Sequence, residues 1–178
     1  MHQQILDFWF EQLEPAKWWT KDERLDRSIE QRFGQLHRQA ASGELWRWRV
    51  TPEGRLAEII LLDQFSRNIH RDRPEAFAHD GMALVLAQEA ITAGADLALP
   101  VVQRSFLYMP FMHSESLPIH ERAVQLFSTP GMESSLDFEI RHRDILRRFG
   151  RYPHRNQILG RASSDEELAF LSQPGSSF

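Results

Sequence analysis

The apolar residues of the chain recur mostly at intervals of three and four positions, which is the spacing of one face of an α-helix. Thr20 and Glu23 have the spacing of a capping box, which marks the start of a helix, and Gly43 provides a stop. Between these signals one stripe of the helix is apolar, and it comprises Leu25, Ile29, Phe33, Leu36 and Ala40.

Similar start and stop signals divide the rest of the chain into helices with short connections, which favours antiparallel helical hairpins. No segment shows the alternation and β-branched enrichment of a strand. We therefore predict an all-α fold, arranged as a bundle or as an array like that of tetratricopeptide-repeat (TPR) proteins. The expected helices begin near Gln3, Thr51, Asp80, Pro100, Ser116, Ser134 or Ser135, and Ser163. Ends are expected near Arg67, Gly94, Pro110, Gly150 and Leu171 for the helices that begin near Thr51, Asp80, Pro100, Ser134 or Ser135, and Ser163, respectively.

A chain of 178 residues suits one domain, so we expect a single helical domain over residues 1–172 and a frayed tail over 173–178. The absence of cysteine excludes disulfides, thiolate metal sites and cysteine nucleophiles. It also fits a reducing compartment, and no signal peptide or membrane span is apparent. We accordingly expect a soluble, cytoplasmic protein that does not bind membranes.

Positive charge is concentrated near the C-terminus. Residues 141–161 hold seven arginines and one acid, a net charge of +6, although the whole chain carries −4. Within this segment the sequence RYPHRNQILGR combines turn chemistry with donors that suit carboxylate or phosphate. The alternatives are an anion-binding site and a solvated basic turn whose arginines pair with acids elsewhere. The candidate residues are His142, His154, Arg155, Asn156 and Arg161.

Two further polar segments lie at expected helix ends. In the first, Arg67 and Asn68 are candidate ligand-binding residues, although Asp63 and Arg67 also have the spacing of an in-helix ion pair. In the second, His113 and Glu115 are compatible with an acid–base pair, with a metal site, or with a structural hydrogen bond. We expect no metal and no cofactor.

These segments resemble a known family. The sequences Leu62-Asp63-Gln64-Phe65 with Arg67-Asn68, Phe106 to Phe111 with His113-Ser114-Glu115, and Pro153-His154-Arg155-Asn156 with Leu159-Gly160-Arg161 are similar to the helical bacterial proteins of domain-of-unknown-function family 924. The resemblance runs nearly end to end, with Ser66 at a position where the family pattern has proline. It implies an all-helical, TPR-like fold and does not imply a reaction.

Three functional hypotheses follow. In the first, the polar segments converge on a pocket for a small anionic ligand, with Arg67, Asn68, His142, Arg155, Asn156 and Arg161 in binding roles and His113, Glu115 and His154 as proton carriers. In the second, the helices form a scaffold for a protein partner. Nucleic-acid binding is the third and is disfavoured, because the chain outside residues 141–161 carries a net charge of −10. The sequence does not reveal the ligand, the reaction, the oligomeric state or the biological process.

Overall fold

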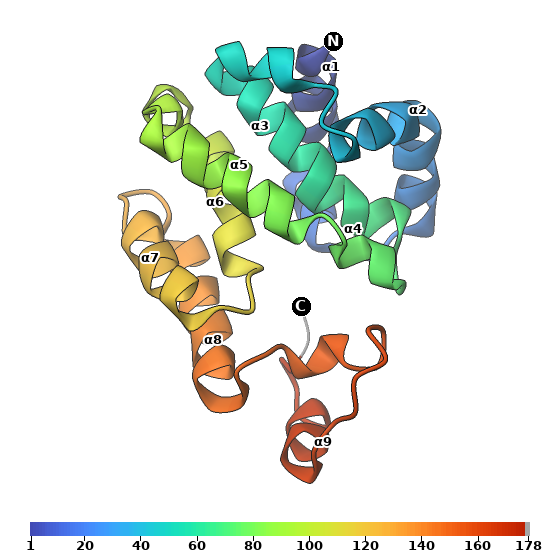
Figure 1. The fold of residues 1–178 in the computed structure, drawn as a ribbon, viewed down its shortest axis with the longest axis vertical. Helices are drawn as coiled ribbons and strands as arrows, with labels where there is room; N and C mark the ends of the chain where they lie inside the picture. The colour runs from blue at the N-terminus through green and yellow to red at the C-terminus, as the bar shows by residue number, and fades with distance from the viewer. Residues whose placement is uncertain (177–178) are drawn as a thin grey trace.

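The computed structural model describes residues 1–176, and every regular element in this range is helical. Figure 1 shows a body of packed helices from which the last part of the chain, orange to red, extends. The α-helices are α1 (His2–Leu6), α2 (Glu23–Ala41), α3 (Pro52–Ile60), α4 (Ser66–Ile69), α5 (Asp80–Thr92), α6 (Val101–Met112), α7 (Leu117–Phe127), α8 (Glu133–Phe149) and α9 (Asp165–Leu171). Short 3-10 or π-helical segments are η1 (Asp7–Gln12), η2 (Pro15–Trp19), η3 (Trp46–Val50), η4 (Leu61–Phe65), η5 (Pro74–Phe77), η6 (Ala95–Ala98) and η7 (Pro153–Arg155).

The centre of the body is the continuous helical rod formed by α3, η4 and α4. Its residues from Leu56 to Ser66 are all buried, because the sequence of this stretch is apolar on almost every side. Thr51 caps the rod by accepting from the Gly54 N–H at 3.1 Å. Only glycine fits at position 54, since an added Cβ would lie 2.0 Å from the Trp48 carbonyl oxygen. The rod therefore packs directly against the preceding turn.

The all-α prediction is confirmed, whereas the TPR-like stacking is not. In a repeat array each helical pair contacts only its neighbours along the chain. Here α3 packs against α1, α5 and α6, so helices that are distant in sequence surround one rod. Later helices do pack in order, α6 on α7 and α7 on α8.

Several expected helix ends differ from the structure by a few residues. The N-cap of α2 is Asp22 rather than Thr20, since its carboxylate accepts from two backbone N–H groups. The capping box of α9 is formed by Ser164 and Glu167, so the helix is capped one position after the start expected near Ser163. Pro110 does not end α6, which continues to Met112, because a proline in the last turn removes only one hydrogen bond.

The C-terminal arm, defined here as residues 151–171, follows Gly150, which adopts a left-handed conformation (φ +70°) and ends α8. Beyond the arm, Ser176 donates its hydroxyl to the Leu171 carbonyl. The tail that we expected to fray over 173–178 lies partly outside the described residues. None of the described helices is both long and apolar enough to cross a membrane.

Candidate functional site

A cavity of about 340 Å³ lies where the C-terminal arm meets the body. Its volume is in the range of small-molecule pockets. The start of α5, the segment before it, the end of α6 and the arm each supply part of the wall. The lining residues are Pro74, Phe77, Ala78, Asp80, Gly81, Leu84, Pro110, His113, Ser114, Glu115, Arg155 and Leu159.

His113 is held in the cavity wall by a buried carboxylate. Its Nδ1 lies 2.7 Å from Oδ1 of Asp63, a side chain that is 1% exposed. Burial raises the pKa of Asp63, but the positive charge of Arg67 and the contact with His113 outweigh it and hold this pKa well below its usual range. An ionised carboxylate only accepts hydrogen bonds, so Nδ1 carries a hydrogen. Burial and the charge of Arg67 lower the pKa of His113, which leaves the ring neutral at pH 7 and its Nε2 a proton acceptor.

Asp63 comes from η4, a π-helical turn inside the central rod. Such turns shift the backbone hydrogen-bond pattern and are frequent at functional sites. Here the Asp63 carbonyl accepts from Nη1 of Arg67 at 2.9 Å, and Gln64 donates to Oδ2 of Asp63 at 2.6 Å. The turn thus presents one buried acid whose oxygens are all engaged.

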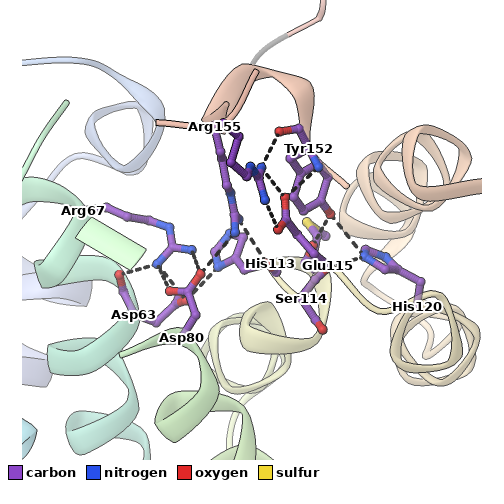
Figure 2. A network of polar contacts seen from close by, with 11 residues as sticks. Asp63, Arg67, Asp80, His113, Ser114, Glu115, His120, Tyr152 and Arg155 are labelled. Atoms are coloured by element: carbon purple, nitrogen blue, oxygen red, sulfur yellow. Dashed lines mark hydrogen bonds and ion pairs between the residues drawn. The ribbon is translucent and has the colours of Figure 1, made fainter. Parts of the chain in front are cut away.

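Two arginines share Asp80 at the start of α5 (Figure 2). Arg67 binds this carboxylate with both Nη atoms at 3.0 Å, and Nη1 of Arg155 approaches it at 3.3 Å. The Arg155 guanidinium lies between the rings of Phe77 and Tyr152, 4.6 and 4.7 Å from their centroids. Burial and the neighbouring Arg67 lower the pKa of Arg155, but an arginine so placed remains charged at neutral pH.

The backbone that carries His113 is anchored by three side chains. The carbonyls of Met112, His113 and Ser114, at the end of α6, accept respectively from Tyr152 Oη at 2.5 Å, Arg155 Nη2 at 3.0 Å and His120 Nε2 at 2.8 Å. These carbonyls have no partner within the helix, so the contacts also complete its C-terminus. The result is a rigid support for the cavity wall.

Glu115 is engaged by the arm rather than by His113. Its two oxygens accept from Nη1 and Nη2 of Arg161 at 2.6 and 2.8 Å, and Oε1 also accepts from the Tyr152 N–H at 2.7 Å. Burial raises the pKa of Glu115, but these hydrogen bonds outweigh it and the pKa lies below its ordinary value. Glu115 is therefore an ionised anchor for the arm.

Behind the loop that joins α6 to α7 lies the fully buried pair His120 and Glu139, whose Nδ1 and Oε1 atoms are 2.7 Å apart. His120 appears at the edge of Figure 2. Since His120 Nε2 donates to a carbonyl, its Nδ1 either accepts from a protonated Glu139 or donates to an ionised one. Burial raises the pKa of Glu139, which favours the protonated form. The pair keeps the loop in place without facing the cavity.

Of the residues predicted from sequence, His113, Glu115 and Arg155 line one cavity, and Arg67 and Arg161 contact its walls. Asn68 lies apart, since its amide donates to Asp26 at 2.8 Å beside Arg71. The others pack in or near the arm: His142 lies against Tyr152, Asn156 accepts from Arg161, and His154 lines a second cavity of about 540 Å³ together with Arg161.

Sequence reasoning missed Asp63, Asp80 and Tyr152 as parts of the site. Asp63 carried a usable signal, because an acid inside the apolar run from Leu56 to Phe65 must find buried partners. Asp80 was interpreted as a helix cap, and it does lie in the first turn of α5. Tyr152 gave no signal of its own.

The arginines of residues 141–161 are matched by acids. Six of the seven form salt bridges: Arg143 with Asp144, Arg147 with Glu121, Arg148 with Glu166, Arg151 with Glu167, Arg155 with Asp80, and Arg161 with Glu115. The sequence left two alternatives for this segment, an anion-binding site and a basic turn whose arginines pair with acids. For these six arginines the structure shows pairing with acids. Among the described residues no cluster of three or more histidines and acids has the arrangement of a metal site.

Residues 5–175 match the model of a family described as bacterial protein of unknown function (DUF924). A comparison with curated proteins found no match. The chain is also similar to a solved structure, that of a protein of unknown function from Agrobacterium tumefaciens. The two share 40% sequence identity over 96% of each chain, with a TM-score of 0.91.

Proposed function

This chain belongs to the bacterial family DUF924, and from the geometry of its cavity we propose that it binds a small anionic molecule, a carboxylate or phosphate, and exchanges a proton with it. The observation that carries the proposal is the meeting of Arg155, a buried cation, and His113, a neutral base oriented by Asp63, on one cavity wall. Arginine contributes the donors for the anion, and histidine contributes the proton acceptor.

In this proposal His113 Nε2 takes a proton from the ligand, and Asp63 stabilises the imidazolium that forms. A buried carboxylate on the opposite ring nitrogen is the arrangement that favours such a transfer. Glu115 and His154 have other roles. Glu115 positions the arm, because its oxygens are occupied by Arg161 and Tyr152. His154 belongs to the second cavity.

Binding is tested by isothermal titration of the full chain with inorganic phosphate and with simple carboxylates at pH 7. We expect one site that is lost in Arg155→Met. Gly81→Leu provides a variant that leaves the charges intact. A Cβ at position 81 meets nothing within 4 Å, so the new side chain enters the cavity without backbone strain. The matched control is Arg148→Met, an arginine paired with Glu166 outside the cavity.

Loss of binding in Arg155→Met and Gly81→Leu but not in Arg148→Met supports the proposal. Equal binding in all four proteins, or no binding to the wild type, refutes it. The proton acceptor is checked separately by ¹⁵N NMR of the histidines. We expect His113 at pH 7 to carry its hydrogen on Nδ1, and a hydrogen on Nε2 instead contradicts the assigned role.

The alternative of a protein-interaction scaffold has weaker support. A repeat scaffold offers a concave surface formed by regularly stacked helical pairs. In this chain, α3 is instead surrounded by α1, α5 and α6. Nucleic-acid binding is disfavoured as well, because the half-exposed arginines of the basic segment, Arg147 and Arg148, are paired with acids.

A further inference from the structure

The cavity lining is part polar and part apolar. Charged and polar groups come from the start of α5, the end of α6 and the arm. The side chains without polar atoms come from η5 and the residue after it, from α5, from α6 and from the arm. The polar lining is Asp80, His113, Ser114, Glu115 and Arg155, and the apolar lining is Pro74, Phe77, Ala78, Leu84, Pro110 and Leu159.

Arg155 is the only cation in this lining that retains unused donors. A guanidinium has five N–H groups. Arg155 donates one from Nη1 to Asp80 Oδ2 and one from Nη2 to the His113 carbonyl. The second hydrogen on each Nη meets no acceptor among residues 1–176 and is left for a ligand. Nε also has no partner in this range, but it is buried, so a ligand in the cavity does not reach it.

The other two arginines near the cavity are not among its lining residues, and most of their donors meet protein acceptors. Arg67 binds Asp80 and the Asp63 carbonyl, and Arg161 binds Glu115, Asn156 and the Tyr152 carbonyl. One anionic group can therefore be held at Arg155. A second anionic group meets no other arginine or lysine in the lining.

Two carboxylates in the lining oppose a second negative charge. Asp80 and Glu115 both border the cavity, and each is already bound by an arginine. A ligand with two charged ends places one of them near these carboxylates or against the apolar side chains of the lining, and either position is unfavourable.

On the basis of the proposed function, we infer that the ligand is a small monocarboxylate with an apolar tail, its carboxylate on Arg155 and its tail against Phe77, Leu84 and Leu159. The cavity volume of about 340 Å³ lies in the range of small-molecule pockets, so a tail of several carbons fits inside it. His113 then faces the carbons next to the carboxylate or a polar substituent on them.

The experiment titrates the full chain with acetate, butyrate and hexanoate, with the dicarboxylate adipate, with inorganic phosphate and with neutral hexanol. Each buried methylene is expected to increase affinity about fourfold, until the cavity is filled. Adipate and hexanol are expected to bind at least tenfold more weakly than hexanoate, and phosphate more weakly than butyrate.

Two variants locate the tail. Gly81→Leu occupies part of the cavity and should remove the gain from acetate to hexanoate, while Leu159→Asn makes its wall polar and should reduce that gain. The matched control is Val85→Asn. Val85 is in α5, like Gly81, but it is 61% exposed and lies outside the cavity lining. This substitution should leave the chain-length dependence unchanged.

The outcomes separate this inference from the proposal on which it rests. If none of these anions binds, the proposed function fails and the inference fails with it. If anions bind, but adipate or phosphate equals hexanoate, or affinity does not rise with chain length, the proposed function stands and the inference is overturned. A rise that also disappears in Val85→Asn places the tail elsewhere and overturns it too.

Discussion

The helical body and the C-terminal arm are held in place by different forces. In the body, Trp9, Phe65 and Phe106 are at most 2% exposed and pack with ring centroids 5.5 to 5.8 Å apart. The arm adds a small apolar cluster in which Tyr152 is the buried aromatic residue. Its remaining attachments are polar, chiefly Arg155 to Asp80 and Arg161 to Glu115.

This difference matters because the candidate ligand cavity lies at the junction. Apolar burial is non-directional and makes the body a rigid support. Charge-assisted hydrogen bonds are directional, so they define where Arg155 and His113 lie relative to each other. Regions with few buried apolar contacts also open at lower free-energy cost, and we expect the arm to open before the body unfolds.

The largest expected effect is a loss of stability in the helical body. Phe65→Ala should lower the free energy of unfolding by about 3–5 kcal/mol, because it leaves a cavity at the centre of the aromatic cluster. Urea denaturation measures this cost. Phe138→Ala, at an α8 position that is 48% exposed, is the control and should cost about 1 kcal/mol or less. Equal costs for the two variants would show that the aromatic cluster is not the main source of stability.

Acid should weaken both regions. Burial, the largest cause in each case, lowers the pKa of His37 in the body to about 4, that of His142 in α8 to about 3 and that of His154 in the arm to about 4. These histidines are neutral when folded and bind protons more readily when unfolded, so stability is complete above about pH 6.5 and falls as the pH decreases toward 4.

Each unit of pKa depression corresponds to about 1.4 kcal/mol, so the summed loss should reach several kcal/mol. Urea denaturation at pH 7 and pH 4.5 measures it. His37→Gln should reduce the pH dependence while leaving the contributions of His142 and His154 unchanged. A stability that is equal at the two pH values contradicts this assignment.

A smaller effect should be confined to the arm. Arg161→Met removes the two hydrogen bonds to Glu115, and charge-assisted bonds of this kind contribute about 1.5–3 kcal/mol. Hydrogen–deuterium exchange should become faster over residues 151–171 and stay unchanged in α2 and α3. Faster exchange throughout the chain would mean that the arm and the body unfold as one unit.

The smallest effect is expected at an exposed ion pair between α8 and the arm. Arg148 and Glu166 form an ion pair in which both side chains are about half exposed or more. Arg148→Ala should therefore change the free energy of unfolding by less than about 1 kcal/mol. A loss comparable to that of Arg161→Met would show that exposed pairs also hold the arm.

Local chemistry made much of the fold predictable. Thr51 before Pro52 and Gly150 after α8 mark helix ends that the structure confirms, because capping depends on residues adjacent in sequence. Where a neighbouring side chain also has an oxygen that can accept from the first turn, the predicted helix start was wrong by a few positions. For α2 the prediction was Thr20, and the observed N-cap is Asp22. Pro110 misled for a different reason, since its helix tolerates a proline in the last turn.

The site was predictable only in part. His113, Glu115 and Arg155 were identified by residue type at helix ends, and the structure brings them to one cavity. The partner of His113 was not predictable, because Asp63 lies 50 positions earlier and its spacing to Arg67 suggested a simple in-helix pair. Asn68 was assigned by the same reasoning as Arg67, yet it faces Asp26 instead.

The amino-acid sequence by itself determined the helical class, most helix positions and the types of group available for chemistry, since these depend on propensity, capping and periodicity within a few residues. Tertiary structure alone decided which arginine keeps free donors, which acid holds the histidine, and that a cavity exists between body and arm. The reason is that charge pairing and burial depend on distances between segments far apart in the chain, and local patterns carry no information about those distances.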